Sequence, residues 1–364
     1  MTYREQSRRD FLRVGIGAAV GAATGTRLLA ASGWPLNPAR PVVSVVKVRN
    51  DRVGFAVEKA IDLLGGIETV AKGKERIMLK PNLVGDSPDF TTKREVIRSL
   101  SHLMKASGKE VSIGEGSAAA GGFNERNGET YRTRNVEILN GMQQHVFDNL
   151  GYTDLAQTMH IPLINLHSGE MVEVSVPGAC SFDRITLHRS LTDIDMLCSV
   201  PMMKTHVLAT VTLGMKNLIG LYPGSIYASV RAGVHDRAAR AGSRGIAFEI
   251  VDMVRANKLG LVVVDGSMAM EGDGPTGGSL VKMGIIVAGT NPLATDMVAA
   301  GIMGFTTQEI PAFSCAQKAG MTPVSVDEIE VRGERISDVW QRFKKPSVVT
   351  WESISNFWGV KEMQ

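Results

Sequence analysis

Charged and polar side chains stand at the ends of several apolar segments in this sequence. The run IMLK ends at Lys80, VSIG is followed by Glu115, and MLCSV is followed by Lys204 and His206. Further along the chain, VVVD ends at Asp265. Lysine ammonium groups suit the binding of phosphate or carboxylate, and a histidine near a carboxylate suits proton transfer or metal binding. These residue types predict a site for an anionic small molecule.

We predict three kinds of role for the candidate residues. The residues able to move a proton are predicted to be catalytic, and these are His206, Lys204 and Asp265. The residues predicted to bind the ligand are Lys80, Asn82, Glu115, Ser117, Thr205, Lys216, Asn217, Gly274 and Thr276. A divalent metal would be held by His206, His235 and Asp296, because imidazole and carboxylate together suit Zn, Fe(II), Mn or Ni. No H-E-x-x-H or similarly tight ligand spacing accompanies this set.

Each candidate also has an ordinary structural interpretation. A single lysine usually extends its ammonium group to solvent, and Asp265 or Asp296 could cap a turn or a helix. The segment EGDGPTGG (271–278) is either a wide glycine turn or a ligand loop. It matches neither a Walker A loop nor a G-x-G-x-x-G fingerprint. An ordinary turn can explain a polar residue at the end of any one strand. It is a weaker explanation for polar residues at the ends of several strands in the same chain.

The segments that carry these residues alternate between strand and helix patterns. We predict strands at 42–49, 76–80, 110–114, 161–166, 195–200, 261–265 and 282–289. We predict helices at 54–65, 93–107, 246–258, 292–304 and 308–319. The prediction is an α/β fold with a mainly parallel, doubly wound sheet and a small antiparallel excursion near 170–190. Ligands bind such sheets beyond the carboxyl ends of the strands. Five polar strand ends would therefore converge on one crevice, the four named above and Asn291 after the strand at 282–289.

The first 33 residues carry the whole positive excess of the chain. The chain has 40 basic and 37 acidic residues, and residues 1–33 contain five arginines and two acidic residues. Ser7–Leu12 match the pattern S/T-R-R-x-F-L, and a Gly- and Ala-rich apolar run follows. This segment resembles a twin-arginine export signal. Because the run is short and contains Arg27, we expect no transmembrane helix there.

The predicted organisation has three parts: the export signal (1–33), a proline-containing linker (34–41) and a single α/β domain (42–364). We expect export through the twin-arginine machinery to the periplasm or to the outer side of the cytoplasmic membrane. The rest of the chain is electrically balanced, which argues against a nucleic-acid-binding protein. The three cysteines, Cys180, Cys198 and Cys315, are far apart, and we expect no cluster or essential disulfide from that spacing.

Several motifs between residues 42 and 320 occur in the order typical of one family. They are KPNLV, GEGS, KTH, GMKNLIGLYPG, VDG, EGDGPTGG and NPLATD. The chain thereby resembles the domain-of-unknown-function family 362. The resemblance implies no particular reaction, although family members often carry a ferredoxin-like iron–sulfur segment. This chain has no cysteine cluster with that spacing, so we expect no iron–sulfur cluster in it.

Two functions fit these observations. The first is an exported enzyme that binds an anionic small molecule, with or without a metal, at the carboxyl ends of the sheet. The second is a noncatalytic protein that binds a cofactor or a metal, or assists maturation, together with an iron–sulfur redox partner. A measurement of catalytic turnover would distinguish the two functions. The sequence alone identifies neither the reaction nor the cofactor.

Overall fold

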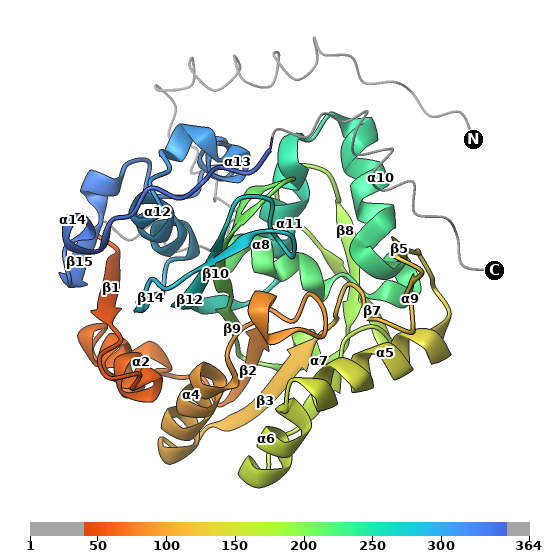
Figure 1. Ribbon diagram of the computed structural model, residues 1–364, viewed down its shortest axis with the longest axis horizontal. Coiled ribbons are helices and arrows are strands. Elements are labelled where there is room, and N and C mark those ends of the chain that lie inside the picture. The colour runs from red at the N-terminus through yellow and green to blue at the C-terminus, as the bar shows by residue number, and fades with distance from the viewer. Residues whose placement is uncertain (1–39, 348–364) are drawn as a thin grey trace, which may run out of the picture. The chain divides into compact units, whose positions relative to one another are not determined.

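The computed structural model describes residues 40–347, and its centre is a sheet of strands drawn from the whole described chain (Figure 1). The strand order is β15-β1-β14-β12-β9-β2-β3-β6. These strands are β1 (Val42–Lys47), β2 (Arg76–Pro81), β3 (Glu110–Glu115), β6 (Leu163–Asn165), β9 (Met196–Val200), β12 (Leu259–Glu271), β14 (Ile285–Gly289) and β15 (Glu330–Gly333). The predicted export signal and residues 34–39 of the predicted linker lie outside the described residues.

Most neighbouring strands of this sheet are parallel, which confirms the predicted fold class. β2 pairs in parallel with both β3 and β9, and β9 pairs in parallel with β12. β14 runs antiparallel to both of its neighbours, β1 and β12. The chain between β12 and β14 contains only a turn and the short strand β13 (Ser279–Val281). β13 pairs antiparallel with the end of β12, so the chain has already turned back before β14 begins.

The direction of β14 corrects one part of the predicted site. The carboxyl end of β14 was expected to join the carboxyl ends of the other strands in one crevice. Gly289 at that end lies opposite Val262 in the first half of β12. Asn291, which follows β14, instead caps α12 (Pro292–Ile302) by accepting a hydrogen bond from the backbone N–H of Ala294.

The segment that carries Lys204 and His206 is itself a strand and not a loop beyond a strand. β10 (Met202–His206) pairs in parallel with the second half of β12 and antiparallel with β11 (Thr210–Thr212). Pro201 separates β10 from β9 and has no N–H to donate to a neighbouring strand. All five residues of β10 are buried.

The predicted antiparallel excursion is present as a separate hairpin. It consists of β7 (Met171–Ser175) and β8 (Arg184–His188), which pair from Met171 opposite His188 to Ser175 opposite Arg184. A second small hairpin joins β4 (Glu125–Arg126) to β5 (Glu129–Thr130).

Helices cover both faces of the sheet, as expected for a doubly wound fold. One face packs against α2 (Val53–Leu63), α4 (Arg94–Ala106), α5 (Val136–Asn149) and α6 (Tyr152–Met159). The other packs against α8 (Gly214–Asn217), α10 (Ala232–Ala241), α11 (Ala247–Ala256), α12 (Pro292–Ile302) and α13 (Pro311–Lys318). The shorter helices are α3 (Ile67–Val70), α7 (Ser190–Asp193), α9 (Gly224–Tyr227) and α14 (Ile336–Val339).

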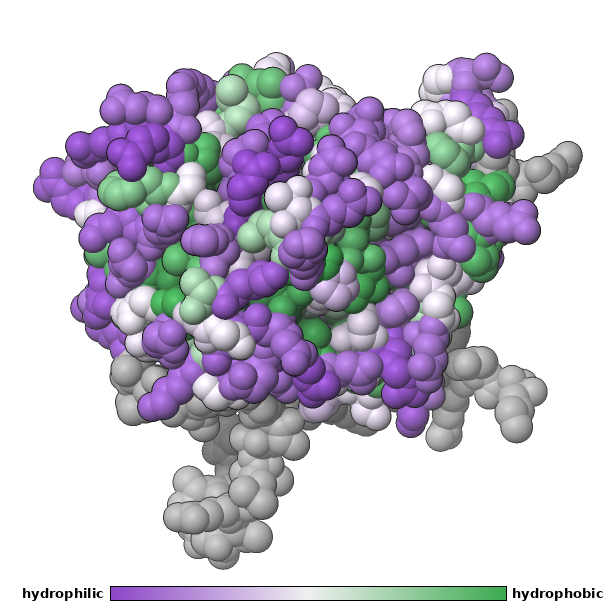
Figure 2. All heavy atoms as spheres, turned by 90° about the horizontal axis from the view of Figure 1, so that it is seen from below, coloured by the Kyte–Doolittle hydropathy of each residue, from purple (hydrophilic) through white to green (hydrophobic). Residues whose placement is uncertain are grey.

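The strand residues divide between two apolar clusters, one on each face. On β2, Ile77 and Leu79 join the cluster under α2 and α4, and Met78 joins the other cluster. This alternation follows from the two-residue period of a strand. The face shown in Figure 2 is mostly polar, with apolar residues in small scattered groups. No helix within residues 40–347 is long and apolar enough to cross a bilayer.

Candidate functional site

A cavity of about 80 Å³ lies where β2 and β3 end, beside β10, α8 and the start of α10. Seven of the predicted site residues line it, and these are Lys80, Asn82, Glu115, His206, Lys216, Asn217 and His235. Asn82 and Lys216 are partly exposed, so the cavity opens to solvent on their side. Its volume holds several water molecules or the head of a small anion, and is below the roughly 300 Å³ at which pockets for larger ligands begin.

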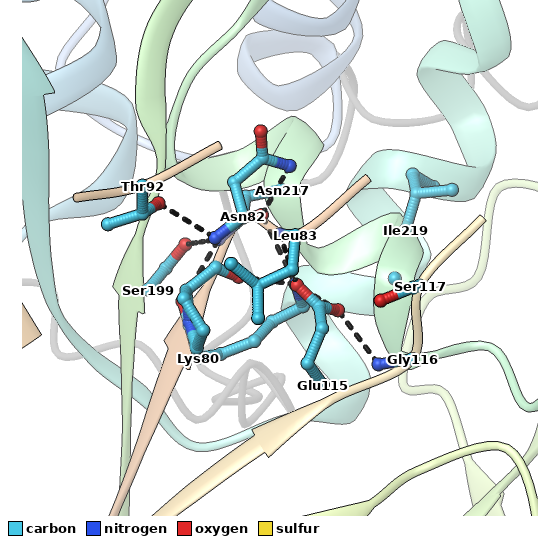
Figure 3. A network of polar contacts seen from close by, with 12 residues as sticks. Lys80, Asn82, Leu83, Thr92, Glu115, Gly116, Ser117, Ser199, Asn217 and Ile219 are labelled. Carbon is cyan, nitrogen blue, oxygen red and sulfur yellow. Dashed lines mark hydrogen bonds and ion pairs between the residues drawn. The ribbon is translucent and has the colours of Figure 1, made fainter. Parts of the chain in front are cut away.

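Lys80 and Glu115 form a buried ion pair in the cavity wall (Figure 3). The Lys80 ammonium donates to both carboxylate oxygens, at 2.8 and 2.9 Å, and to the carbonyl oxygen of Pro81 at 2.9 Å. The Glu115 carboxylate also accepts hydrogen bonds from the N–H groups of Leu83 and Gly116. Burial lowers the pKa of Lys80, and the adjacent Glu115 carboxylate opposes that effect. The hydrogen-bonding capacity of Lys80 is therefore used within the protein.

Asn217 connects the ion pair to its neighbours (Figure 3). Its Oδ1 accepts hydrogen bonds from Lys80 Nζ and Asn82 Nδ2, both at 3.2 Å. Its Nδ2 donates to the carbonyl oxygen of Lys80 and to Ser199 Oγ. Gly220 leaves space for the pair, since a Cβ there would lie 2.7 Å from Glu115 Oε1 and 2.8 Å from Lys80 Nζ. α8, which carries Asn217, is thus fixed to the ends of β2 and β9.

Asp296 fixes the first turn of α8 and does not line the cavity. Its carboxylate accepts hydrogen bonds from the N–H groups of Gly214 at 2.7 Å and Met215 at 2.8 Å. Burial raises the pKa of Asp296 to about 7, although these two hydrogen bonds favour the charged form. The helix-cap interpretation of Asp296 therefore fits its contacts, whereas the predicted metal set of His206, His235 and Asp296 is not assembled. The described residues contain no group of three His, Cys, Asp or Glu residues that could hold a metal ion.

Lys216 differs from Lys80 in its contacts. It lines the cavity next to Asn217, but its ammonium group has no hydrogen bond or ion pair with any other residue in the described part of the chain. Burial lowers the pKa of Lys216 to about 7, and repulsion from Lys80 and Arg231 adds to the effect. Lys216 is thus close to half protonated at neutral pH and has all of its donors available.

Arg231 is the main cavity residue that the sequence analysis missed. Its guanidinium group is buried and donates to the carbonyl oxygens of Gly116, Ser117, Ile219 and Gly220. Burial lowers its pKa to about 10, so it remains a cation at neutral pH. It lies next to α10 rather than at a strand end, with φ of 60°, and Val230 before it has φ of 48°. Nothing in the sequence pattern marks this left-handed turn, and such strained backbone often occurs at functional sites.

His206 and His235 face the cavity as neutral imidazoles. Burial lowers the pKa of His206 well below its usual value, and the charges of Lys216 and Lys204 lower it further. His206 Nδ1 accepts a hydrogen bond from the Leu208 N–H at 3.1 Å, so its proton is on Nε2. Burial and the nearby Lys216 and Arg231 lower the pKa of His235 to about 3. Neither histidine adds to the positive charge at neutral pH.

The remaining predicted residues do not line the cavity. Lys204 Nζ donates to the carbonyl oxygens of Phe90 at 2.6 Å and Pro275 at 3.1 Å, and therefore ties two loops together. Asp265 accepts hydrogen bonds from the Lys93 N–H, before α4, and from Ser267. The predicted site residues that do not line the cavity are Ser117, Lys204, Thr205, Asp265, Gly274, Thr276 and Asp296.

A larger open groove of about 1160 Å³ lies along α5, α6 and the edge strand β6. Its lining residues include no lysine, arginine, aspartate or glutamate in the described chain. The charge and the ionisable groups are instead concentrated at the smaller cavity, which we take as the candidate site.

Residues 77–301 match the model of a protein family described as "Domain of unknown function (DUF362)". The chain belongs to this family. The matched range includes every residue that lines the cavity. A relative within the curated proteins is the thylakoid-associated protein sll1697 of Synechocystis sp.. It is 27% identical over 270 residues, which make up 73% of this chain and 75% of the relative.

Among solved structures, this family member is similar to the lactate racemase apoprotein from Thermoanaerobacterium thermosaccharolyticum. The sequence identity is 11% and the TM-score is 0.43, and the match covers 73% of this chain and 57% of that chain. A protein from Thermotoga maritima matches with 12% identity and a TM-score of 0.35, over 61% of this chain and 51% of that one. The chain thus spans little more than half of each of these structures.

Proposed function

We propose that this protein is an enzyme that binds the anionic group of a small molecule in the cavity beside Lys216. One observation carries the proposal: the cavity is lined by three cations, Lys80, Lys216 and Arg231, and by a single carboxylate, that of Glu115. Glu115 is paired with Lys80. Among the cavity residues, Lys216 and Arg231 form no ion pair with a carboxylate, although the Glu115 charge also favours the charged form of Arg231.

Cations that lack an ion-pair partner in a confined cavity are costly, and an anion would reduce that cost. Removing a charge from water without a partner is strongly unfavourable, and the charged group responds by shifting its pKa. The pKa of Lys216, lowered to about 7, is such a response. A bound phosphate, sulfate or carboxylate group would contact the Lys216 ammonium at the cavity mouth. The positive electrostatic potential of Arg231 behind it would stabilise the same group.

Each residue has a separate role in this proposal. Lys216 has free donors and contacts the anion, and as a group with a pKa near neutrality it can also give up or take a proton. His206 supplies a neutral Nε2–H as a further donor. Arg231 acts as a positioning residue, because its guanidinium group holds the carbonyl groups of residues 116, 117, 219 and 220. Lys204 is also assigned to positioning, through Phe90 and Pro275.

The proposal is tested by titrating the purified protein with sulfate, phosphate and small carboxylates at constant ionic strength, using calorimetry and melting curves. The informative variant is Lys216→Met, which keeps the length of the side chain and removes its charge. We expect at least one anion to bind the wild type, and the variant to bind it about tenfold or more weakly, as for other lost charge-assisted hydrogen bonds.

Lys72→Met is the matched control, because Lys72 is exposed and does not line the cavity. It should bind anions as the wild type does. Equal binding by the wild type and Lys216→Met, or the same loss in both lysine variants, would contradict the proposal.

We also propose that the chain is exported by the twin-arginine machinery. The support is the match of Ser7–Leu12 to the export pattern and the placement of the chain's positive excess within residues 1–33.

A further inference from the structure

Two of the three cysteines lie next to each other on the side of the sheet covered by α11 and α13. Cys180 is in the loop between β7 and β8, and Cys315 is in α13. Their Sγ atoms are 4.0 Å apart, although 135 positions separate them in the sequence. The spacing of the cysteines in the sequence gave no sign of this contact.

The contact rests on a defined set of polar interactions. The Asp252 carboxylate on α11 accepts hydrogen bonds from the N–H groups of Cys180 at 2.6 Å and Ser181 at 2.7 Å. Arg255 donates to the carbonyl oxygen of Gly178 in the loop and to that of Ala319 at the end of α13. One helix, α11, thus holds both cysteine-bearing segments in place.

The environment of the two thiols differs from that of the third. Cys180 and Cys315 are both partly exposed, whereas Cys198 is fully buried in β9. A hydrogen bond from the Cys315 thiol lowers the pKa of Cys180, and the Arg255 cation contributes in the same direction. The contact with Cys180, together with burial, raises the pKa of Cys315, and burial raises the pKa of Cys198, so Cys180 is the best nucleophile of the three. Thiolate character and access together determine which cysteines react.

We propose that Cys180 and Cys315 are a redox-active pair that a small-molecule disulfide oxidises to an intramolecular disulfide. The Cys180 thiolate attacks one sulfur of the small disulfide, which forms a mixed disulfide and releases one small thiolate. Cys315, after losing its proton to solvent, then attacks Cys180 Sγ and releases the second small thiol. The two protein thiols are oxidised, and the small disulfide is reduced to two thiols. Closing the bond requires the sulfurs to approach from 4.0 Å to about 2 Å, which rotation of the two side chains can provide.

The disulfide would connect the β7–β8 loop to α13. The same loop carries Phe182, whose ring packs 5.7 Å from the Tyr222 ring and lies under the Arg237 guanidinium of α10. Because α10 also carries His235, the oxidised state would tie the β7–β8 loop and the helix beside the cavity more firmly to the body of the protein. A disulfide that closes so long a chain segment lowers the conformational entropy of the unfolded state. The oxidised protein should therefore melt about 5 °C or more above the reduced protein.

The test uses the full chain, incubated with oxidised or reduced glutathione, then unfolded in N-ethylmaleimide and analysed by intact mass and peptide mapping. In the oxidised sample we expect a Cys180–Cys315 peptide, and a maleimide label on Cys198 alone. In the reduced sample all three cysteines should be labelled. Cys315→Ser should keep one glutathione on Cys180, because the second step is blocked. Cys180→Ser lacks the attacking thiolate, so Cys315 and Cys198 should both be labelled by maleimide after the same oxidation.

Cys198→Ala serves as the control and should form the same disulfide. Labelling of all three cysteines after oxidation would overturn the proposal. A cross-link that includes Cys198, or glutathione retained separately on Cys180 and Cys315 in the wild type, would overturn it as well.

Discussion

The Lys80 ammonium group and the Glu115 carboxylate form a two-pronged ion pair, with both N–O distances below 3 Å and both side chains at most 2% exposed. The two charges neutralise each other; Lys80 also donates a hydrogen bond to Asn217 Oδ1, and Glu115 accepts hydrogen bonds from the N–H groups of Leu83 and Gly116. It therefore serves as a wall of the cavity, whereas the charge available to a ligand comes from Lys216 and Arg231.

We predict that Glu115→Gln destabilises the fold by about 3 kcal/mol or more, because it leaves the Lys80 charge buried without its partner. The matched control is Glu173→Gln, which breaks the exposed ion pair between Glu173 and Arg184. Exposed pairs contribute little, so that variant should stay within about 0.5 kcal/mol of the wild type. Urea denaturation measures both free energies of unfolding. Similar small losses in the two variants would show that the Lys80–Glu115 pair is not structural.

The alternation of buried strands and amphipathic helices was enough to predict the fold. Predicted helix 93–107 corresponds to α4 at residues 94–106, and predicted helix 292–304 corresponds to α12 at residues 292–302. Strand direction was harder, because β14 reverses through a short connection that the apolar pattern does not reveal. The residues after Pro201 were expected at a strand end but form the buried strand β10.

The site could be predicted in part for a similar reason. Lys80 and Glu115 lie at the ends of neighbouring parallel strands, so the topology alone brings them together. Arg231 reaches the cavity through a left-handed turn before α10, which no strand-end rule identifies. Lys204 was predicted beyond the end of a strand and Asp265 at the end of one, yet their side chains bind backbone groups of other loops. The direction in which a side chain points decides whether a residue at a strand end lines the cavity, and the sequence does not specify that direction.

The pH dependence of anion binding follows from the pKa of Lys216, which is about 7 in the folded protein against an ordinary value of 10.5. Between about pH 7 and pH 10.5, the unfolded chain holds the Lys216 proton more tightly than the folded protein does. The Lys216 contribution to the free energy of unfolding therefore rises with pH in this range. Sulfate favours the protonated form. Its stabilising effect should therefore be largest below about pH 7 and should decline as the pH rises above that value.

Melting curves with and without sulfate across this pH range measure the effect, and sulfate keeps its charge throughout. In Lys216→Met the decline with pH should disappear. A sulfate effect that grows with pH in the wild type would be incompatible with the role assigned to Lys216.

Asp296→Ala should lower the free energy of unfolding by about 1–3 kcal/mol, because the N–H groups of Gly214 and Met215 lose their buried acceptor. Since Asp296 lies outside the cavity lining, the metal content of the purified protein should not change. Denaturation curves and elemental analysis of both proteins measure the two effects. Loss of a bound metal at unchanged stability would restore the metal-ligand interpretation of Asp296.

Replacing both Arg8 and Arg9 with lysine should leave the precursor in the cytoplasm, because the twin-arginine pattern requires both guanidinium groups. Cell fractionation followed by immunoblotting measures the distribution. The matched control is Arg27→Lys, which lies outside the Ser7–Leu12 motif and should be exported normally. Normal export of the double variant would refute the twin-arginine prediction.

The claim that the cavity holds an anion is tested most directly by crystals grown with selenate, whose anomalous scattering identifies its position. We predict a selenium peak in the cavity with a selenate oxygen within about 3 Å of Lys216 Nζ, and no peak there in Lys216→Met crystals. Selenate in the wild type only at surface sites away from Lys216, or an unchanged cavity peak in the variant, would contradict the account.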